Sequence, residues 1–174
     1  FDLNGDGQDE VIVIVDGKIR VYDLTGQLLT EQEIPPPNAY GECANDPEWA
    51  TVNDALCPVQ MGDGEMGLYI KDRYWNIHFY DSQLNHRWHH AVNTGHYPFP
   101  VDLDGDGRQE ILCCHTLFDV DGNIVWKADL PDHVDGVAFL SLREGEPKRL
   151  YLTAGEAGLV CLDPATGEVL ERLR

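Results

Sequence analysis

Basic residues are scarce in this sequence: 12 Lys and Arg stand against 31 Asp and Glu, which gives a formal net charge of -19. A surface this acidic repels nucleic acid and anionic membranes, so neither is expected as a partner. The sequence also lacks a signal peptide and an apolar run long enough to insert into a membrane. Because the chain begins at Phe1 inside a loop motif, we expect it to be a piece of a longer protein.

The five cysteines contain no CxxC pair of the kind that binds zinc. Cys43 and Cys57 flank a polar segment and are candidates for a disulfide bond in an oxidising compartment. Cys113 and Cys114 are adjacent in an expected strand, where their side chains point to opposite faces. Buried free thiols are the expected role of these two residues.

The 3.6-residue periodicity of amphipathic helices is absent, and short apolar runs separated by turns are found instead. Val11–Val15 and Lys18–Tyr22, for example, flank Asp16-Gly17, which is a strong hairpin signal. Four times, a strand ends in an Asp-led turn that a further strand follows. The leading residues of these turns are Asp23, Asp81, Asp119 and Asp163, at spacings of 58, 38 and 44.

These repeats predict an all-β fold, namely a β-propeller of about four blades of antiparallel strands. Units of a few antiparallel strands that recur roughly every 40 residues are typical of propeller blades. The whole chain, residues 1–174, is expected to form one propeller region, and the long first spacing places an insertion at residues 35–61. The expected blades are about 1–34, 62–92, 96–130 and 132–174.

Two loops rich in Asp each precede an apolar strand. Acidic or amide side chains at alternate positions, followed by a Glu where the strand starts, supply the oxygen ligands that Ca2+ prefers. A turn without a metal is the alternative, because Asp and Gly favour turns by themselves. The expected calcium ligands are Asp2, Asn4, Asp6 and Glu10 in the first loop, and Asp102, Asp104, Asp106, the backbone carbonyl of Arg108 and Glu110 in the second.

The Asp-x-Asp-x-Asp-Gly-x-x-Glu motif before an apolar strand resembles the FG-GAP and VCBS-type calcium-binding propeller repeats. More narrowly, residues 93–107, in which a His precedes the second loop, are similar to the propeller of family 11 rhamnogalacturonan lyases. The stretch 117–136 looks like the next element of that propeller, and the likeness is best over residues 60–145. The resemblance implies part of a seven- or eight-bladed ring, which missing blades or a second copy would complete.

The resemblance also implies β-elimination on an acidic polysaccharide, in which Ca2+ neutralises a uronate carboxylate and a neutral His, or a Lys or Arg, takes the adjacent proton. His96 and His133 are the catalytic candidates on this interpretation. Candidates for substrate binding are Tyr97, His115, Asp135 and Trp49. Structural roles stay open for the histidines: His96 as a blade cap, His133 in a turn or calcium contact, and His115 in the core.

Residues 86–90 contain three histidines beside a tryptophan. Strand alternation places His86, Trp88 and His90 on one face and His89 on the other. Metal binding is one interpretation of this cluster, and the covering of a blade edge is the more common role for such residues.

Two functions follow from these observations. The first is a calcium-binding propeller module of an extracellular, cell-surface or periplasmic protein, which binds a polysaccharide or a protein. The second is part of a rhamnogalacturonan lyase. Convergence of His96 and His133 near a metal would discriminate between them.

Overall fold

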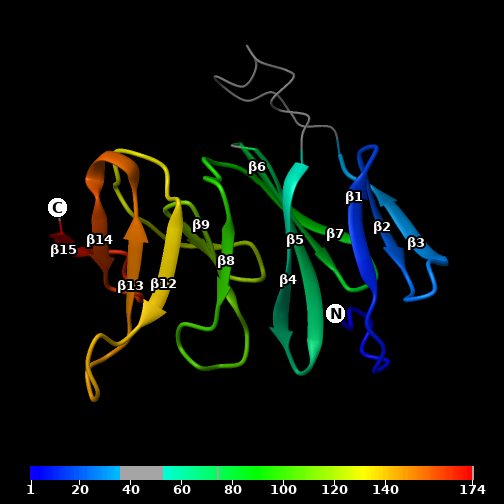
Figure 1. Ribbon diagram of the computed structural model, residues 1–174, viewed down its shortest axis with the longest axis horizontal. Coiled ribbons are helices and arrows are strands. Elements are labelled where there is room, and N and C mark those ends of the chain that lie inside the picture. Colours follow the sequence, from blue (N-terminus) through cyan, green and yellow to red (C-terminus); the bar gives the residue numbers. More distant parts are fainter. Residues whose placement is uncertain (36–52, 74, 174) are drawn as a thin grey trace, which may run out of the picture. The chain divides into compact units, whose positions relative to one another are not determined.

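Short antiparallel strands are the main regular structure of the chain, as a computed structural model shows for residues 1–35, 53–73 and 75–173 (Figure 1). Over these residues the strands form four sheets of three or four strands each. The one helical segment described is a 3-10 turn, Gly155–Ala157. No helix in the described part of the chain is long and apolar enough to span a membrane.

Two compact units divide the chain, Phe1–Val92 (unit 1) and Asn93–Arg174 (unit 2). In every sheet, strands adjacent in sequence are adjacent in space, so each sheet is an antiparallel meander. The sheets of unit 1 are β1 (Val11–Val15), β2 (Lys18–Tyr22) and β3 (Leu28–Glu33), and then β4 (Asn53–Gly62), β5 (Glu65–Asp72), β6 (Asn76–Asp81) and β7 (His86–Ala91). The sheets of unit 2 are β8 (Pro98–Val101), β9 (Glu110–Cys113), β10 (Thr116–Phe118) and β11 (Ile124–Lys127), and then β12 (Gly136–Leu140), β13 (Arg149–Thr153), β14 (Leu159–Leu162) and β15 (Val169–Leu173).

The Asp-led turns occupy the same place in all four sheets, between the last two strands. Asp23 Oδ1 accepts hydrogen bonds from the backbone N–H groups of Thr25 and Gln27, at 2.9 and 2.8 Å. The carboxylates of Asp81, Asp119 and Asp163 accept backbone N–H groups of their own turns in the same way. Each carboxylate therefore satisfies donors that the turn leaves outside the ladder.

Each unit buries its core where its two sheets contact each other. In unit 1, Ile19 and Val21 of β2 pack with Leu68 and Ile70 of β5. In unit 2, Leu112, Leu117 and Trp126 of the first sheet pack with residues of the second, including Leu152 and Val160. Face-to-face contact of successive antiparallel meanders is the packing of propeller blades.

Trp126 ties the outer strands of the two sheets of unit 2 together. Its indole Nε1 donates a hydrogen bond of 2.9 Å to the backbone oxygen of Pro164, 38 residues further along the chain. The indole ring lies directly over Gly167, where a Cβ atom would overlap it. Trp126 is 7% exposed, and the hydrogen bond to Pro164 supplies the partner that the N–H of a buried indole needs.

Two local expectations require correction. Residues 53–61 are not part of an insertion, because they form most of β4, which pairs with β5 from Asn53 to Gly62. Cys114 lies in the turn after β9 with φ 55°, so only Cys113 occupies a strand position. Both thiols are buried and free, as expected. Cys57 lies half-buried on β4 with a free thiol, and Cys43, its candidate disulfide partner, falls outside the described residues.

Candidate functional site

The two Asp-rich loops fold alike although one precedes β1 and the other connects β8 to β9. Asp2 Oδ1 and Oδ2 accept the N–H groups of Gly5 and Gly7, at 2.7 and 2.9 Å. Asp102 makes the equivalent bonds to Gly105 and Gly107, at 2.6 and 3.1 Å. The first carboxylate of each loop thus folds the backbone around itself.

The last carboxylate closes each loop from the strand side. Glu10 Oε2 accepts the N–H of Leu3 at 2.8 Å, and Glu110 Oε2 accepts the N–H of Leu103 at 2.9 Å. Leu3 is 3% exposed and belongs to the core of unit 1, so the loop is anchored by packing as well.

Carboxylate oxygens converge in both loops. Oxygens of Asp2, Asp6 and Glu10 all lie within 4.8 Å of one another, as do those of Asp102, Asp104 and Asp106. Glu110 lies beside the second group, where burial and then the charges of Asp104 and Asp106 raise its pKa above the ordinary value. These distances suit a hard divalent cation with oxygen ligands.

At the positions whose side chains are expected to bind Ca2+, the loops differ once: Asn4 stands where the second loop has Asp104. Asn4 Nδ2 donates to Glu10 Oε1 at 3.0 Å and to Asp6 Oδ2 at 3.3 Å, which relieves repulsion between those carboxylates. In the second loop, the side chain of Arg108 points to a residue outside the loop and forms an ion pair of 2.8 Å with Asp121. Its backbone carbonyl stays the predicted ligand.

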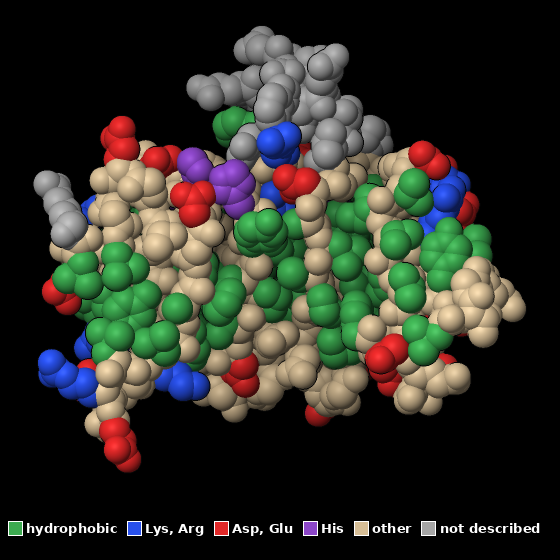
Figure 2. Space-filling model, viewed as in Figure 1, with side chains coloured by type: hydrophobic (Ala, Val, Ile, Leu, Met, Phe, Trp, Pro, Cys, Tyr) green, Lys and Arg blue, Asp and Glu red, His purple; other side chains and the backbone are tan. Residues whose placement is uncertain are grey.

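His96, His133 and Asp135 converge at the other end of β8. His96 precedes β8 and the other two residues precede β12, and the starts of these strands lie at the same edge of unit 2 (Figure 1). Asp135 Oδ1 lies 3.2 Å from His96 Nε2 and 3.3 Å from His133 Nε2. Histidine side chains lie beside acidic ones at the surface in Figure 2.

Asp132 fixes the orientation of His133. Its Oδ1 lies 2.6 Å from His133 Nδ1 and accepts the backbone N–H of the same residue at 2.8 Å. These two hydrogen bonds lower the pKa of Asp132 below its ordinary value, so its carboxylate stays ionised.

The other residues proposed for substrate binding are distributed differently. Tyr97 is 73% exposed and lines a hollow of about 160 Å3 together with Asp135. His115 lies in the turn after β9, where it is half-buried near Lys127. Its burial and, to a smaller extent, the charge of Lys127 lower the pKa of His115. Trp49 lies outside the described residues.

The histidines of residues 86–90 do not share faces as expected. Tyr80 pairs with His86 and Phe79 with Trp88, so Arg87 is an extra residue in a β-bulge. The bulge moves His86 to the face of His89, and both rings contact His78 of β6.

This group of imidazoles, in which His78 is buried, His89 is part-buried and His86 is exposed, was not found from the sequence. The distance between His78 Nδ1 and His86 Nε2 is 3.1 Å, and the rings of His78 and His89 stack at 4.6 Å. Burial, helped by the two neighbouring imidazoles, lowers the pKa of His78 to about 3. His78 therefore stays neutral and serves as a core residue at neutral pH.

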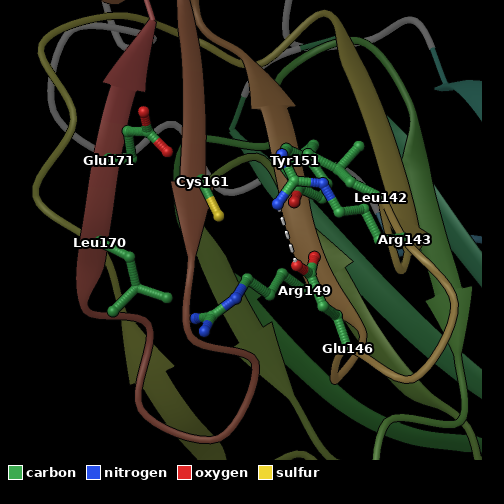
Figure 3. A pocket seen from close by; sticks show the side chains of 8 residues that line it. All are labelled: Leu142, Arg143, Glu146, Arg149, Tyr151, Cys161, Leu170 and Glu171. Carbon is green, nitrogen blue, oxygen red and sulfur yellow. Dashed lines mark ion pairs between the residues drawn. The ribbon is translucent and has the colours of Figure 1, made fainter.

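A wider hollow of about 500 Å3 lies on the second sheet of unit 2 (Figure 3). Tyr151, Cys161 and Leu170 come from its three last strands, and an ion pair of 3.6 Å joins Arg143 and Glu146 at its rim. The hollow combines apolar side chains with basic and acidic ones.

Comparison with known proteins gives a fold and no family. No protein-family model matches the chain, and no curated protein sequence matches it. Among solved structures, it is similar to the biofilm matrix protein Bap1 of V. cholerae, with a TM-score of 0.69 and 19% identity over 99% of this chain and 27% of that one. It is similar to a Bacillus licheniformis rhamnogalacturonan lyase PL11, with a TM-score of 0.66 and 21% identity over 90% of this chain and 30% of the lyase.

A third similar structure is BamB from Moraxella catarrhalis, with a TM-score of 0.51 and 17% identity over 95% of this chain and 49% of that one. The lyase and BamB are propeller-like proteins, and the predicted all-β propeller fold is confirmed. The chain spans about half or less of the length of the three structures, so their activities are not carried over by the fold.

Proposed function

We propose that this chain is a calcium-binding β-propeller module of an extracellular or surface protein that associates with carbohydrate. The observation that carries the proposal is the convergence of carboxylate oxygens in two loops that fold alike, each within 4.8 Å. A bound cation would neutralise these carboxylates, and the raised pKa of Glu110 reflects the burial and repulsion that the cation would offset. Extracellular modules bind Ca2+ at the concentrations found outside cells.

Carbohydrate is the proposed ligand because of the fold and one surface. Two of the similar structures are a biofilm matrix protein and a rhamnogalacturonan lyase. Exposed Tyr97 lies at a hollow that Asp135 also lines, next to His96. An exposed aromatic ring beside hydrogen-bonding groups suits the apolar face and the hydroxyls of a sugar.

Further blades or a second copy would cover apolar surface that each unit leaves open. In unit 1, one face of β1 exposes Val11, Val13 and Val15 by 46, 37 and 38%. In unit 2, the hollow of Figure 3 contains Leu142 and Leu170, which are 66 and 43% exposed. Propeller blades normally bury such faces against neighbours.

A second candidate function, part of a polysaccharide lyase, rests on the two histidines that face Asp135. A neutral imidazole within reach of a substrate could take the proton at C5 of a uronate while Ca2+ neutralises its carboxylate. Asp135 would orient the rings. The strongly acidic chain requires that calcium ions bridge to such a substrate.

Thermal unfolding with saturating Ca2+ and with excess chelator tests the calcium sites. We expect Ca2+ to raise the melting temperature, because an ion that binds only the folded state stabilises it by about 2.7 kcal/mol at a hundredfold excess over Kd. The double variant Asp104→Ala, Asp106→Ala should lose part of this rise. Glu144→Ala, which removes an exposed carboxylate outside both loops, is the matched control. An equal rise in the double variant would contradict calcium binding by the second loop.

Binding of pectic polysaccharide to the calcium-loaded chain, with an uncharged polysaccharide as control, tests the ligand. We expect retention that Tyr97→Ala weakens without change in melting temperature. Formation of unsaturated uronide, detected by its ultraviolet absorbance and lost in His133→Ala, would favour the lyase. Absence of binding to both polymers would contradict carbohydrate association.

A further inference from the structure

The group of His96, His133 and Asp135 differs from the two Asp loops in its donor atoms. Two imidazole nitrogens and one carboxylate oxygen lie within 4.8 Å of one another. The His96 and His133 rings meet edge to face with their centroids 4.9 Å apart, and both Nε2 atoms point at the same oxygen of Asp135. Three donors are thus directed at one point.

We propose that these three residues form a site for a borderline divalent metal such as Zn2+, separate from calcium. Ca2+ prefers six to eight oxygen ligands, whereas imidazole nitrogen favours Zn2+ and its neighbours in the first transition row. Three protein ligands leave a coordination position open to water or a substrate oxygen. The part-exposed side chains, at 40, 38 and 48%, leave that position accessible.

Asp132 supplies the outer support that metal-binding histidines normally have. Ligating imidazoles usually donate the N–H opposite the metal to a carboxylate, which fixes the tautomer and the ring orientation. His133 Nδ1 has this partner in Asp132 Oδ1, at 2.6 Å. When Nδ1 holds the proton of the ring, the Nε2 lone pair lies 3.3 Å from the Asp135 carboxylate, where one cation can bind both atoms.

The backbone around the group is built for close approach. Asp132 lies against Gly155, where φ is 41° and a Cβ atom would collide with the carboxylate. Gly95, with φ 58°, lies so close to the backbone of Val134 that a Cβ atom would be 3.2 Å from its carbonyl oxygen. The N–H of Asp135 donates to the backbone oxygen of Thr153 at 2.9 Å. The segments that carry the three donors are therefore held together.

Metal binding has a consequence for the lyase alternative. The Nε2 lone pair that binds Zn2+ cannot at the same time accept a proton from a sugar. If the metal is bound, His133 acts as a ligand, and a sugar oxygen or water would occupy the open position.

The test is titration of the tag-free, calcium-saturated chain with Zn2+ in competition with a chromophoric chelator, because Ca2+ then fills the Asp loops. We expect one tight Zn2+ site, and at least a tenfold loss of affinity in His96→Gln and in His133→Gln. Asp132→Asn should lower the affinity by about 10–100-fold, as for other outer carboxylates. His115→Gln, which alters a half-buried histidine outside the group, should bind like the parent chain.

Co2+ gives a second readout that loss of folding does not imitate. Its visible absorption should change when imidazole ligands replace water, and this change should disappear in His133→Gln while the metal-free melting temperature stays that of the parent. Unchanged Zn2+ affinity and Co2+ absorption in both His96→Gln and His133→Gln would overturn the proposal, as would a parent chain that binds neither metal.

Discussion

In unit 1, His78 is buried among other imidazoles, whereas in unit 2 His96 and His133 are part-exposed and face a carboxylate. The neighbours, and not the residue type, decide the role of each ring. His78, which lies among other imidazoles, is a neutral core residue, whereas the two imidazoles beside Asp135 are candidate ligands. The Asp loops make the opposite point, because the same motif gives nearly the same hydrogen bonds in both units.

Loss of the first loop carboxylate should have the largest effect, since Asp102 both bonds the loop backbone and contributes to the oxygen cluster. Asp102→Ala should abolish the calcium-dependent stabilisation of unit 2, about 2.7 kcal/mol at a hundredfold excess of Ca2+. Asp2→Ala is the matched change in unit 1. Calorimetry with and without chelator measures both. A variant that keeps the full calcium-dependent stabilisation would show that the loop it alters is a turn and not a metal site.

Acidification should destabilise the chain through the buried imidazole of His78 in unit 1. An unfolded His has a pKa near 6.5, and that of folded His78 is about 3. Its folded pKa is depressed, so its stabilisation is complete above pH 6.5 and is lost as the pH falls toward 3. The limiting slope is about 1.4 kcal/mol per pH unit, which gives about 2 kcal/mol between pH 6.5 and 5.

Urea unfolding of the parent chain and of His78→Phe at pH 7 and pH 5 measures this contribution. Burial also lowers the pKa of His86 and His89, so the variant should retain part of the slope. Tyr80, the other titratable side chain against His78, does not ionise in this range because burial raises its pKa. An identical slope in parent and variant would rule out His78 as the group responsible.

Exchange of the one expected side-chain ligand that differs between the loops should have the smallest effect. Asn4→Asp adds a ligand charge and removes the amide that bonds Glu10, so the calcium affinity of the first loop should rise on the order of tenfold. Asp104→Asn should lower the affinity of the second loop and, in chelator, raise its stability by relieving Glu110. Calcium titration by calorimetry gives both values. Changes of the opposite sign would show that this position does not face the ion.

Features set by local chemistry could be predicted from the sequence. The Asp16-Gly17 hairpin pairs Val15 with Lys18, and Asp23 binds the backbone of its own turn. The neighbourhood of His96, His133 and Asp135 was anticipated only as separate candidates, because residues 96 and 133 meet through the packing of two sheets.

Features set by tertiary structure could not be predicted from the sequence. The bulge at Arg87 follows from pairing with β6, and no local signal in a run of polar and aromatic residues marks it. The start of β4 at Asn53 is equally hidden, because no local signal in the sequence before it marks where pairing with the following strand begins.

The position of Trp126 allows the unfolding of unit 2 to be followed by tryptophan fluorescence. It is the only tryptophan among residues 93–174, and Trp49, Trp75 and Trp88 all belong to residues 1–92. Because its indole joins the two sheets of unit 2, its emission wavelength reports whether those sheets are together or solvated. Trp126→Phe would leave a chain whose fluorescence comes from unit 1 alone, so the order in which the two units melt can be followed with light.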